Sequence, residues 1–403
     1  MTGVGEIAPT AGLAPRLRDL ATLPTAPRAL EAAICRLFNL PDIEIVNTGT
    51  AALLVAFRAL KARAPGRTTV IVPAYTCPLV VIAAHAAGLA CIACDTVAGG
   101  FDLDVDHLAR LVDARTLCVV PTHFGGVLTD VDAVRAALPP DVAIVEDAAQ
   151  AFGATWGPRS VGLAGDIGVF SFGAGKGFTL YEGGAFVARD PALMQTMRQE
   201  LARIAQPSIN AEIASCIAFF GYHVFYTPGG LALFYGRPKR AALARGDDIA
   251  AAGDAFDLDI AVRGVGAWRK SVGLQALTRL PAHIAQCRRS HARLAEVLGR
   301  VPGVHVHRPI GPAAPIATFL FATLPDTPAH RDRLMQLWRS RLGVAKLFSR
   351  AIGDYPYLAP LLQPSPTPHA RALAATTLTV STHPGLSPQA EAAIVSALEG
   401  GHT

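Results

Sequence analysis

Between residues 43 and 190, short apolar runs alternate with segments whose apolar residues recur at helical spacing. The runs are rich in β-branched residues and are bounded by glycine, proline or polar residues, as buried strands are. The predicted strands cover residues 43–47, 69–75, 89–95, 117–123, 142–147, 167–172 and 184–189. The predicted helices cover residues 50–63, 79–87, 104–114 and 130–138. This alternation predicts an α/β domain with a mostly parallel sheet that helices cover on both faces.

The pattern becomes less regular after residue 190. Residues 191–262 favour helices, and residues 265–298 predict one or two long helices. The last predicted strands cover 304–307 and 317–322, and the last predicted helices cover 329–342 and 388–398. Because single cores stop growing near about 250–300 residues, a chain of 403 residues suits two domains. We predict a large domain at residues 1–262 and a smaller C-terminal α/β domain at residues 263–403.

Residues 218–226 form an aromatic stretch in a chain in which only 7% of the residues are aromatic. A membrane span over residues 213–235 is disfavoured, because it would contain His223, Pro228, Gly229 and Gly230. We expect a buried helix or an interface at this position. An apolar wall for a substrate, or a surface that touches lipid, is the alternative.

Composition and charge limit the classes of function that the chain could have, in particular nucleic-acid binding and metal binding. Apolar residues make up 51% of the chain and charged residues 17%, which is typical of a packed protein. The net charge of +5 comes without a basic run, so we expect no nucleic-acid partner. Cys91 and Cys94 form a C-x-x-C within a predicted strand and lack a second ligand pair, so we expect no metal site. Seven scattered cysteines and an N-terminus unlike a signal peptide predict a cytoplasmic protein.

Polar residues gather at the positions where predicted strands end. These strand ends lie at residues 47–50, 74–76, 123–125, 147–150 and 171–176. In parallel sheets, ligands bind beyond the carboxyl ends of the strands. The sequence therefore predicts one active site that is assembled from these segments.

Three of the strand ends carry candidate chemistry. Gly49 lies in a strand-to-helix turn, where free amides and the helix dipole favour a phosphate. Asp147 follows a strand and could keep a pyridine nitrogen protonated, although such an aspartate often serves as a helix N-cap. Lys176 lies among small residues, where desolvation would expose a neutral amine that can form a Schiff base. The plainer role for an isolated lysine is to reach solvent.

Residues 43–190 resemble the DegT/StrS-type sugar aminotransferase family of fold type I enzymes that depend on pyridoxal 5'-phosphate (PLP). The motifs that carry the resemblance are Thr48–Leu53, Val72–Thr76, Glu146–Gln150, Phe170–Lys176 and Gly183–Ala185. A turn at Thr382–Ser387 resembles the C-terminal turn of the family. The resemblance implies the PLP-dependent transferase fold type I, with a mostly parallel seven-stranded-type sheet in the large domain.

The resemblance also implies the roles of individual residues. Lys176 would hold PLP as a Schiff base, Asp147 would pair with its pyridine nitrogen, and Gln150 would lie near its ring hydroxyl. The phosphate would be held by Gly49, Thr50, Ala51 and Ser171. The family further implies a homodimer whose active sites lie at the interface.

Two departures from the family pattern stand out. Cys77 occupies the position where the family has an aromatic residue stacked on the cofactor ring, so Tyr75 or another side chain would cover the ring. Residues 268–275 replace an Asn-Tyr-Arg motif whose asparagine reaches the cofactor phosphate of the partner subunit. Arg269 and Lys270 are the candidates to replace that contact.

The leading functional hypothesis is transamination. An amino acid donor, glutamate by resemblance, would give its amino group to a keto acceptor, a nucleotide-linked keto sugar in a biosynthetic pathway. The first alternative keeps PLP but changes the reaction to a lyase, a condensation or the amination of an apolar acceptor. The second is a binding or regulatory protein without catalysis, against which the pair of Asp147 and Lys176 argues.

Overall fold

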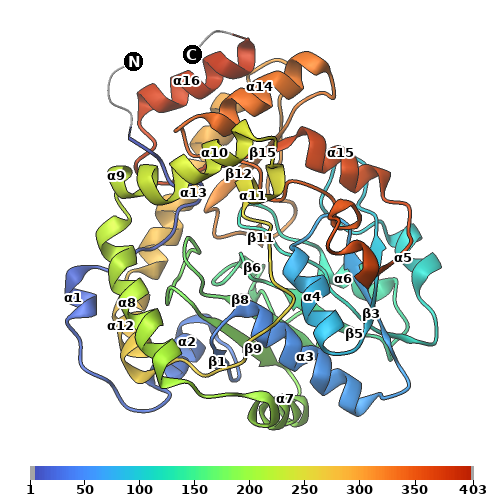
Figure 1. Cartoon of the computed structure of the whole chain (residues 1–403). Helices are drawn as coiled ribbons and strands as arrows, with labels where there is room; N and C mark the ends of the chain where they lie inside the picture. The colour runs from blue at the N-terminus through green and yellow to red at the C-terminus, as the bar shows by residue number, and fades with distance from the viewer. Residues whose placement is uncertain (1–4, 401–403) are drawn as a thin grey trace.

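The structure, a computed structural model, describes residues 5–400. At its centre lies an eight-stranded sheet in the order β1-β9-β8-β5-β4-β2-β3-β14 (Figure 1). Its strands are β1 (Glu44–Val46), β2 (Thr69–Pro73), β3 (Ala90–Cys94), β4 (Thr116–Val119), β5 (Ala143–Asp147), β8 (Ile167–Ser171), β9 (Gly184–Ala188) and β14 (Leu362–Gln363). β9 is antiparallel to both β8 and β1, and the other neighbours are parallel.

The predicted α/β fold is therefore confirmed, with one difference in strand number. We expected seven strands, and the structure has eight. The eighth strand, β14, is only two residues long and comes from the C-terminal part of the chain, where it pairs with β3. So short a strand has too few residues to produce a periodic pattern that the sequence could reveal.

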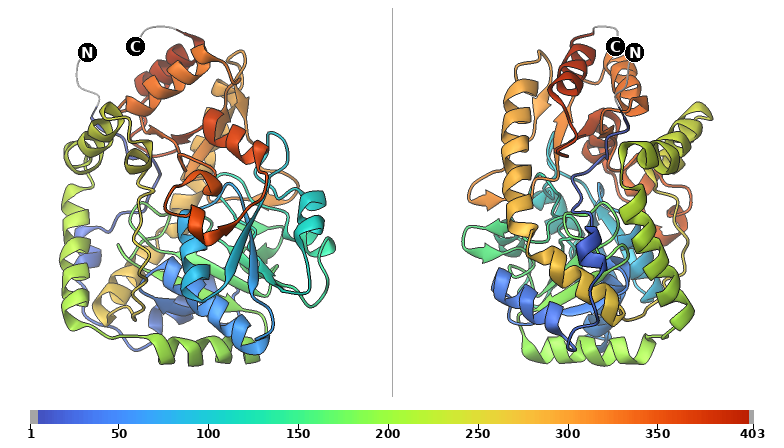
Figure 2. Two further views of the ribbon diagram at one scale, coloured as in Figure 1. Left: turned by 45° about the vertical axis from the view of Figure 1, so that its right-hand side comes forward. Right: turned by 90° about the vertical axis from the view of Figure 1, so that its left-hand side faces the viewer.

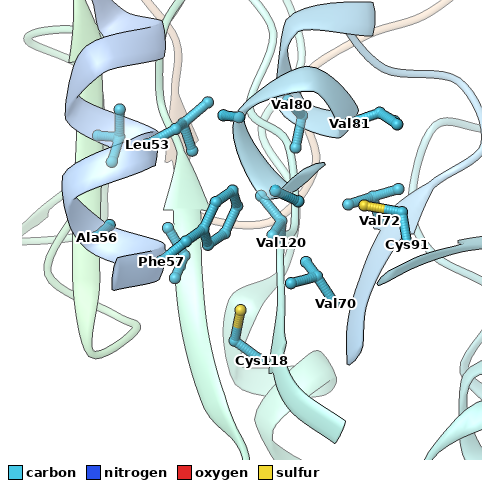
Figure 3. Close-up of a cluster of buried hydrophobic side chains, with 14 of the residues drawn as sticks. Leu53, Ala56, Phe57, Val70, Val72, Val80, Val81, Cys91, Cys118 and Val120 are labelled. Carbon is cyan, nitrogen blue, oxygen red and sulfur yellow. The ribbon is translucent and has the colours of Figure 1, made fainter. Parts of the chain in front are cut away.

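Helices cover both faces of the large sheet. They are α3 (Gly49–Arg63), α4 (Pro78–Ala86), α5 (Val105–Leu111), α6 (Val131–Ala136) and α7 (Pro191–Ile204). Val70 and Val72 of β2 pack in one core with Phe57 of α3 (Figure 3), whereas Ile71 packs in a second core with α5 and α6. Successive strand residues alternate between the faces, so a continuously apolar strand fills both cores.

A smaller antiparallel sheet lies toward the C-terminus. Its order is β10 (His305–Val306), β12 (Phe319–Thr323), β15 (Thr377–Ser381) and β13 (Val344–Ala345). The helices of this region are α13 (Leu280–Leu298), α14 (Pro328–Arg339), α15 (Pro368–Thr376) and α16 (Pro388–Glu399). Short pieces complete it, namely η2 (Ile352–Asp354) and η3 (Ala359–Leu361). A three-stranded sheet joins β11 (Ala313–Ala314), β6 (Thr155–Trp156) and β7 (Arg159–Ser160).

The N-terminal helices pack against a helix from the middle of the chain. These elements are α1 (Leu17–Leu20), α2 (Ala29–Phe38) and α12 (Ala267–Leu277). Leu30 and Ile34 of α2 share a core with Ala276 and Leu277 of α12. The division of the chain at residue 262 stays a prediction.

The aromatic stretch lies in a helical hairpin along one side of the molecule (Figure 2). Its elements are α8 (Ile209–Phe225), α9 (Pro228–Leu231), the π-helix η1 (Ala232–Gly236), α10 (Arg237–Ala244) and α11 (Asp248–Ala252). Phe219 is fully buried, as expected, whereas Phe220 is 50% exposed. Within the described residues, no single helix is long and apolar enough to cross a membrane; residues 209–225 and 228–244 meet the criterion only together and are bent by 113°.

Candidate active site

A pocket of 380 Å³ lies at the carboxyl ends of β5 and β8. We call it the Lys176 pocket. It is lined by seven of the predicted site residues, namely Gly49, Thr50, Cys77, Asp147, Gln150, Ser171 and Lys176. Parallel strands end at one edge of a sheet, so residues more than a hundred positions apart in the sequence meet there.

Lys176 and Asp147 are the two charged groups that define the chemistry of the pocket. Burial lowers the pKa of the Lys176 amine, while electrostatic interactions with Cys77 and Asp147 act to raise it. The Asp147 side chain is buried, and burial raises the pKa of its carboxyl group. A depressed lysine pKa makes the neutral, nucleophilic amine more abundant near neutral pH.

The start of α3 forms a phosphate-sized corner of the pocket. Thr48 caps the helix, since its Oγ1 accepts a hydrogen bond from the amide of Ala51 at 3.0 Å. The amides of the first helical residues lack acceptors within the helix and suit an anion, aided by the helix dipole. A Cβ atom on Gly49 would stand 3.0 Å from the Cβ of Ser171. Glycine therefore permits α3 to begin directly beside the end of β8.

Gln150 lines the pocket and has a side-chain oxygen without a hydrogen-bond partner among the described residues. Its Oε1 is buried and has no hydrogen-bond partner within residues 5–400. A buried acceptor without a partner is costly, and in native proteins such an atom calls for a bound group. This orphaned oxygen, the glycine-lined corner and the lysine–aspartate pair together fit PLP. Lys176 would hold its aldehyde end, Asp147 its ring nitrogen, and Gly49, Thr50 and Ser171 its phosphate.

Two of the residues predicted to contact the cofactor, Ala51 and Tyr75, do not line the pocket. The backbone amide of Ala51 is used by Thr48, and the residue is fully buried away from the pocket. Tyr75 is 1% exposed and packs against the rings of Phe348 and Phe101, with centroids 5.4 and 5.7 Å away. Its ring is therefore part of the core and does not cover the cofactor site. Cys77 lines the pocket instead, and burial raises its thiol pKa to about 12, which keeps the thiol neutral.

The two candidates to replace the partner-subunit contact, Arg269 and Lys270, both form ion pairs within their own chain. Arg269 is 1% exposed, and its Nε donates to Glu212 at 2.8 Å while its Nη1 donates to the carbonyl of Glu182 at 2.5 Å. Lys270 forms an ion pair with Glu31. Both cations are thus occupied by partners in their own chain.

Sequence reasoning assigned no role to His123, which also lines the pocket. Its Nε2 lies 3.0 Å from Oε2 of Glu146, and its Nδ1 accepts a hydrogen bond from the amide of Thr129 at 3.3 Å. Nε2 must then carry the proton and donate to Glu146. Burial alone would raise the pKa of Glu146, but the hydrogen bond from His123 helps to lower it. The strand-end position of His123 was the available signal.

Asp254 closes the far end of the pocket and could not be found from sequence. It is 3% exposed and accepts hydrogen bonds from the amide of Ser349 at 2.9 Å and from the Tyr355 hydroxyl at 2.5 Å. Burial raises the pKa of its carboxyl group. Its partners lie about a hundred residues away, and no local pattern indicates that contact.

A larger groove of 610 Å³ lies at the amino ends of the strands, away from the candidate chemistry. The arginines that line it are paired with aspartates, as in Arg63 with Asp190 and Arg67 with Asp141. Its size therefore does not make it the candidate active site.

Residues 22–211 match the sequence model of the DegT/DnrJ/EryC1/StrS aminotransferase family. This part of the chain, just under half of its length, is similar to that family. The match contains all seven pocket residues predicted from sequence, so the motifs of the DegT/DnrJ/EryC1/StrS family and the geometry of the pocket agree.

Curated relatives match a little over a third of the chain. The 3-amino-5-hydroxybenzoate synthase of Amycolatopsis mediterranei (strain S699) is 38% identical over 146 residues, 36% of this chain and 37% of that protein. The dTDP-3-amino-3,4,6-trideoxy-alpha-D-glucose transaminase of Streptomyces venezuelae is 36% identical over 155 residues, 38% of this chain and 40% of that protein. The chain thus spans less than half the length of these relatives.

A solved structure extends the likeness of the fold to nearly the whole chain. Helicobacter pylori PseC, an aminotransferase involved in the biosynthesis of pseudoaminic acid, superposes with a TM-score of 0.74 at 16% identity. The superposition covers 98% of both chains. The likeness therefore includes the smaller C-terminal sheet as well as the large sheet.

Proposed function

We propose that this protein is a PLP-dependent aminotransferase that moves an amino group from an amino acid, glutamate in the first instance, to a keto acceptor. The observation that carries the proposal is the meeting of Lys176 and Asp147 in one buried pocket beside the start of α3. A binding protein would require neither group. The net reaction exchanges the oxygen of the acceptor carbonyl for the amino nitrogen of the donor, which leaves as a 2-oxo acid.

Lys176 and Asp147 would have different roles in the proposed reaction. When bound, PLP supplies an aldehyde that captures an amino group and a ring that stabilises negative charge on the neighbouring carbon. Lys176 has a depressed pKa, so its neutral amine could take up a proton from the donor carbon and deliver it to the cofactor carbon that receives the amino nitrogen. Asp147 presents a buried carboxylate that would stabilise a protonated ring nitrogen.

The acceptor we propose first is a nucleotide-linked keto sugar in a biosynthetic pathway. Relatives of the chain include a GDP-perosamine synthase and the dTDP-sugar transaminase, whose names give amino sugars as products. Another relative is named for an amino-hydroxybenzoate. An acceptor with an apolar or aromatic group is therefore the second candidate, and a second cavity beside Lys176 favours it.

We further propose a homodimer with shared active sites. Among the described residues that line the Lys176 pocket there is no arginine, so the cation for the donor carboxylate would come from the partner subunit. Ile209, Ile213 and Ile217 of α8 are 80%, 52% and 68% exposed and lie at helical spacing. An apolar stripe of this kind on a surface supports a protein contact. The seven unpaired cysteines support a cytoplasmic location.

The proposed function is tested by incubating the PLP-loaded protein with glutamate that carries a ¹⁵N amino group. The proposal expects one equivalent of 2-oxoglutarate per active site in a single turnover, with the ¹⁵N retained on the protein-bound cofactor. A keto acceptor added afterwards should leave with the label. Protein that binds PLP but forms no 2-oxo acid from any common amino acid would refute the proposal.

A further inference from the structure

A second cavity, of 450 Å³, adjoins the Lys176 pocket. The two share Gln150, Lys176 and Leu347 among their lining residues. We call it the aromatic cavity, after the rings that line it, which belong to Tyr222, Tyr226, Phe234, Tyr235 and Phe319. Its volume falls in the range of about 300–1,000 Å³ that is usual for small-molecule sites.

The end of α8 builds one wall of the aromatic cavity. Tyr222 and Tyr226 are four residues apart, and their ring centroids lie 4.8 Å from each other. Their hydroxyls are used by the backbone: Tyr222 accepts from the amide of Gly175 at 3.2 Å, and Tyr226 donates to the carbonyl of Thr10 at 3.4 Å. Burial raises the pKa of Tyr226 to about 12, so its hydroxyl stays neutral. The wall therefore offers aromatic rings and no charge.

The π-helix η1 supplies another part of the lining. Phe234 and Tyr235 lie in this five-residue segment and both line the cavity. Phe234 is 60% exposed, and its ring lies 4.7 Å from that of Phe225. π-Helices are rare and occur frequently at functional sites. An exposed phenylalanine in such a segment, at the mouth of a cavity, suits contact with an apolar ligand.

The residues of this chain that line the aromatic cavity offer little positive charge to a buried diphosphate. Of the described residues that line it, Lys176 alone carries a formal charge. The nearby cations Lys239 and Arg240 both pair with Glu6, at 3.8 and 2.9 Å. Burying an unpaired anion is expensive, whereas burying an apolar group is favourable.

We infer that the acceptor carries an apolar group, aromatic or aliphatic, that occupies the aromatic cavity while its carbonyl lies at the wall shared with the Lys176 pocket. The inference rests on the proposed aminotransferase function and narrows the acceptor class. It applies to any ketone or keto sugar that bears such a substituent. Lys176 and Gln150 lie at the shared wall, where the polar end of the acceptor would be.

The test compares two exposed phenylalanines of the same helical hairpin. Phe234→Ser removes a ring that lines the aromatic cavity, and Phe220→Ser removes a ring that is 50% exposed on α8 and does not line it. The probe is 4-phenyl-2-butanone, a neutral ketone, titrated into the full-length PLP-loaded proteins by ligand-observed NMR. We expect saturable binding to the wild type, about a fivefold or larger loss of affinity in Phe234→Ser, and unchanged affinity in Phe220→Ser.

Absent binding to the wild type, or an equal change in both variants, would overturn the inference. So would a dTDP-linked keto sugar that binds more tightly than the ketone and loses the same affinity in Phe234→Ser, because the nucleotide would then occupy the cavity. Formation of 2-oxoglutarate from glutamate in a single turnover is measured on all three proteins and requires no acceptor. If the wild type forms none, the proposed function fails; if all three form it without ketone binding, only the inference fails.

Discussion

Glu146 and Asp147 are consecutive residues of β5, yet the pKa values of their carboxyl groups shift in opposite directions. Burial alone would raise the pKa of both carboxyl groups. Glu146 accepts hydrogen bonds from His123 and from two backbone amides, and these lower its pKa. Asp147 accepts one, from the amide of Ala149 at 3.0 Å, and its pKa is raised. Adjacent strand residues point to opposite faces, so one carboxylate is fixed in the interior while the next serves the pocket.

Glu146→Gln should lower the free energy of unfolding by about 1–3 kcal/mol at pH 7, because the new amide group would oppose a backbone N–H donor. A lowered folded-state pKa means that the carboxylate stabilises the fold above its unfolded pKa and that this stabilisation is lost as the pH falls through the folded value. The difference in free energy of unfolding between the wild type and Glu146→Gln should therefore shrink at acidic pH. Urea unfolding at a series of pH values measures it. The exposed Glu296→Gln is the control and should show no deficit.

Asp147→Asn should make the cofactor-free protein more stable at neutral pH while it removes activity. A raised folded-state pKa means that the stabilisation is complete below the unfolded pKa and is lost as the pH rises through the folded value. The additional free energy of unfolding of Asp147→Asn should thus vanish at acidic pH. We expect the glutamate half-reaction to slow by about a hundredfold or more, since a charge that supports the reaction is lost. A variant less stable than the wild type at pH 7 would contradict this account.

Gly184→Ala should disturb the phosphate corner from outside the pocket. A Cβ atom at this position of β9 would stand 2.2 Å from the carbonyl carbon of Thr48 and 2.3 Å from the nitrogen of Gly49. We expect about 1–3 kcal/mol of destabilisation and weaker PLP binding, because the start of α3 must move. PLP titration followed by visible absorbance, with urea unfolding in parallel, checks both. Gly66→Ala, which would meet no atom within 4 Å, should behave as the wild type.

Lys176→Ala should lower the rate of the glutamate half-reaction by about a thousandfold or more, because the group that moves the proton is gone. The visible absorbance of bound PLP should also disappear or shift. Stopped-flow absorbance and 2-oxoglutarate quantification measure the two effects. Lys61→Ala is the matched control, since Lys61 lies in the last turn of α3 and donates to the carbonyls of Ala87 and Gly88. A Lys176→Ala protein with half-reaction rates near those of Lys61→Ala would refute the role of Lys176.

The pocket could be predicted from the sequence because its parts are local signals at strand ends. Gly49, Asp147 and Lys176 each lie next to a short apolar run, and parallel strands bring such ends together. The same logic predicted that Tyr75 contacts the cofactor, but Tyr75 does not line the pocket. It also follows a strand, but its ring enters a cluster with Phe101 and Phe348, which come from distant segments. The direction of a side chain beyond a strand end depends on such long-range packing.

The aromatic cavity lay beyond the reach of sequence reasoning for the same reason. Its walls come from residue 10, from the end of α8 and from Phe319 in β12, which the chain separates by about a hundred residues or more. The aromatic stretch indicated an interface or a substrate wall but not which of its rings would serve. In the structure the rings of this stretch have different environments. Phe219 is buried in a core, whereas Tyr222 and Tyr226 line the cavity.

The central claim is that Lys176 is the lysine that holds PLP, and borohydride reduction followed by peptide mass spectrometry tests it most directly. Two other lysines compete, since partial or full burial lowers the pKa of both Lys239 and Lys346 to about 8. Lys239, however, donates to the carbonyl of Ser340 at 3.2 Å, and Lys346 donates to that of Ala374 at 2.7 Å. We expect the reduced cofactor on the peptide that contains Lys176. A label on Lys239 or Lys346, or on no lysine, would contradict the account.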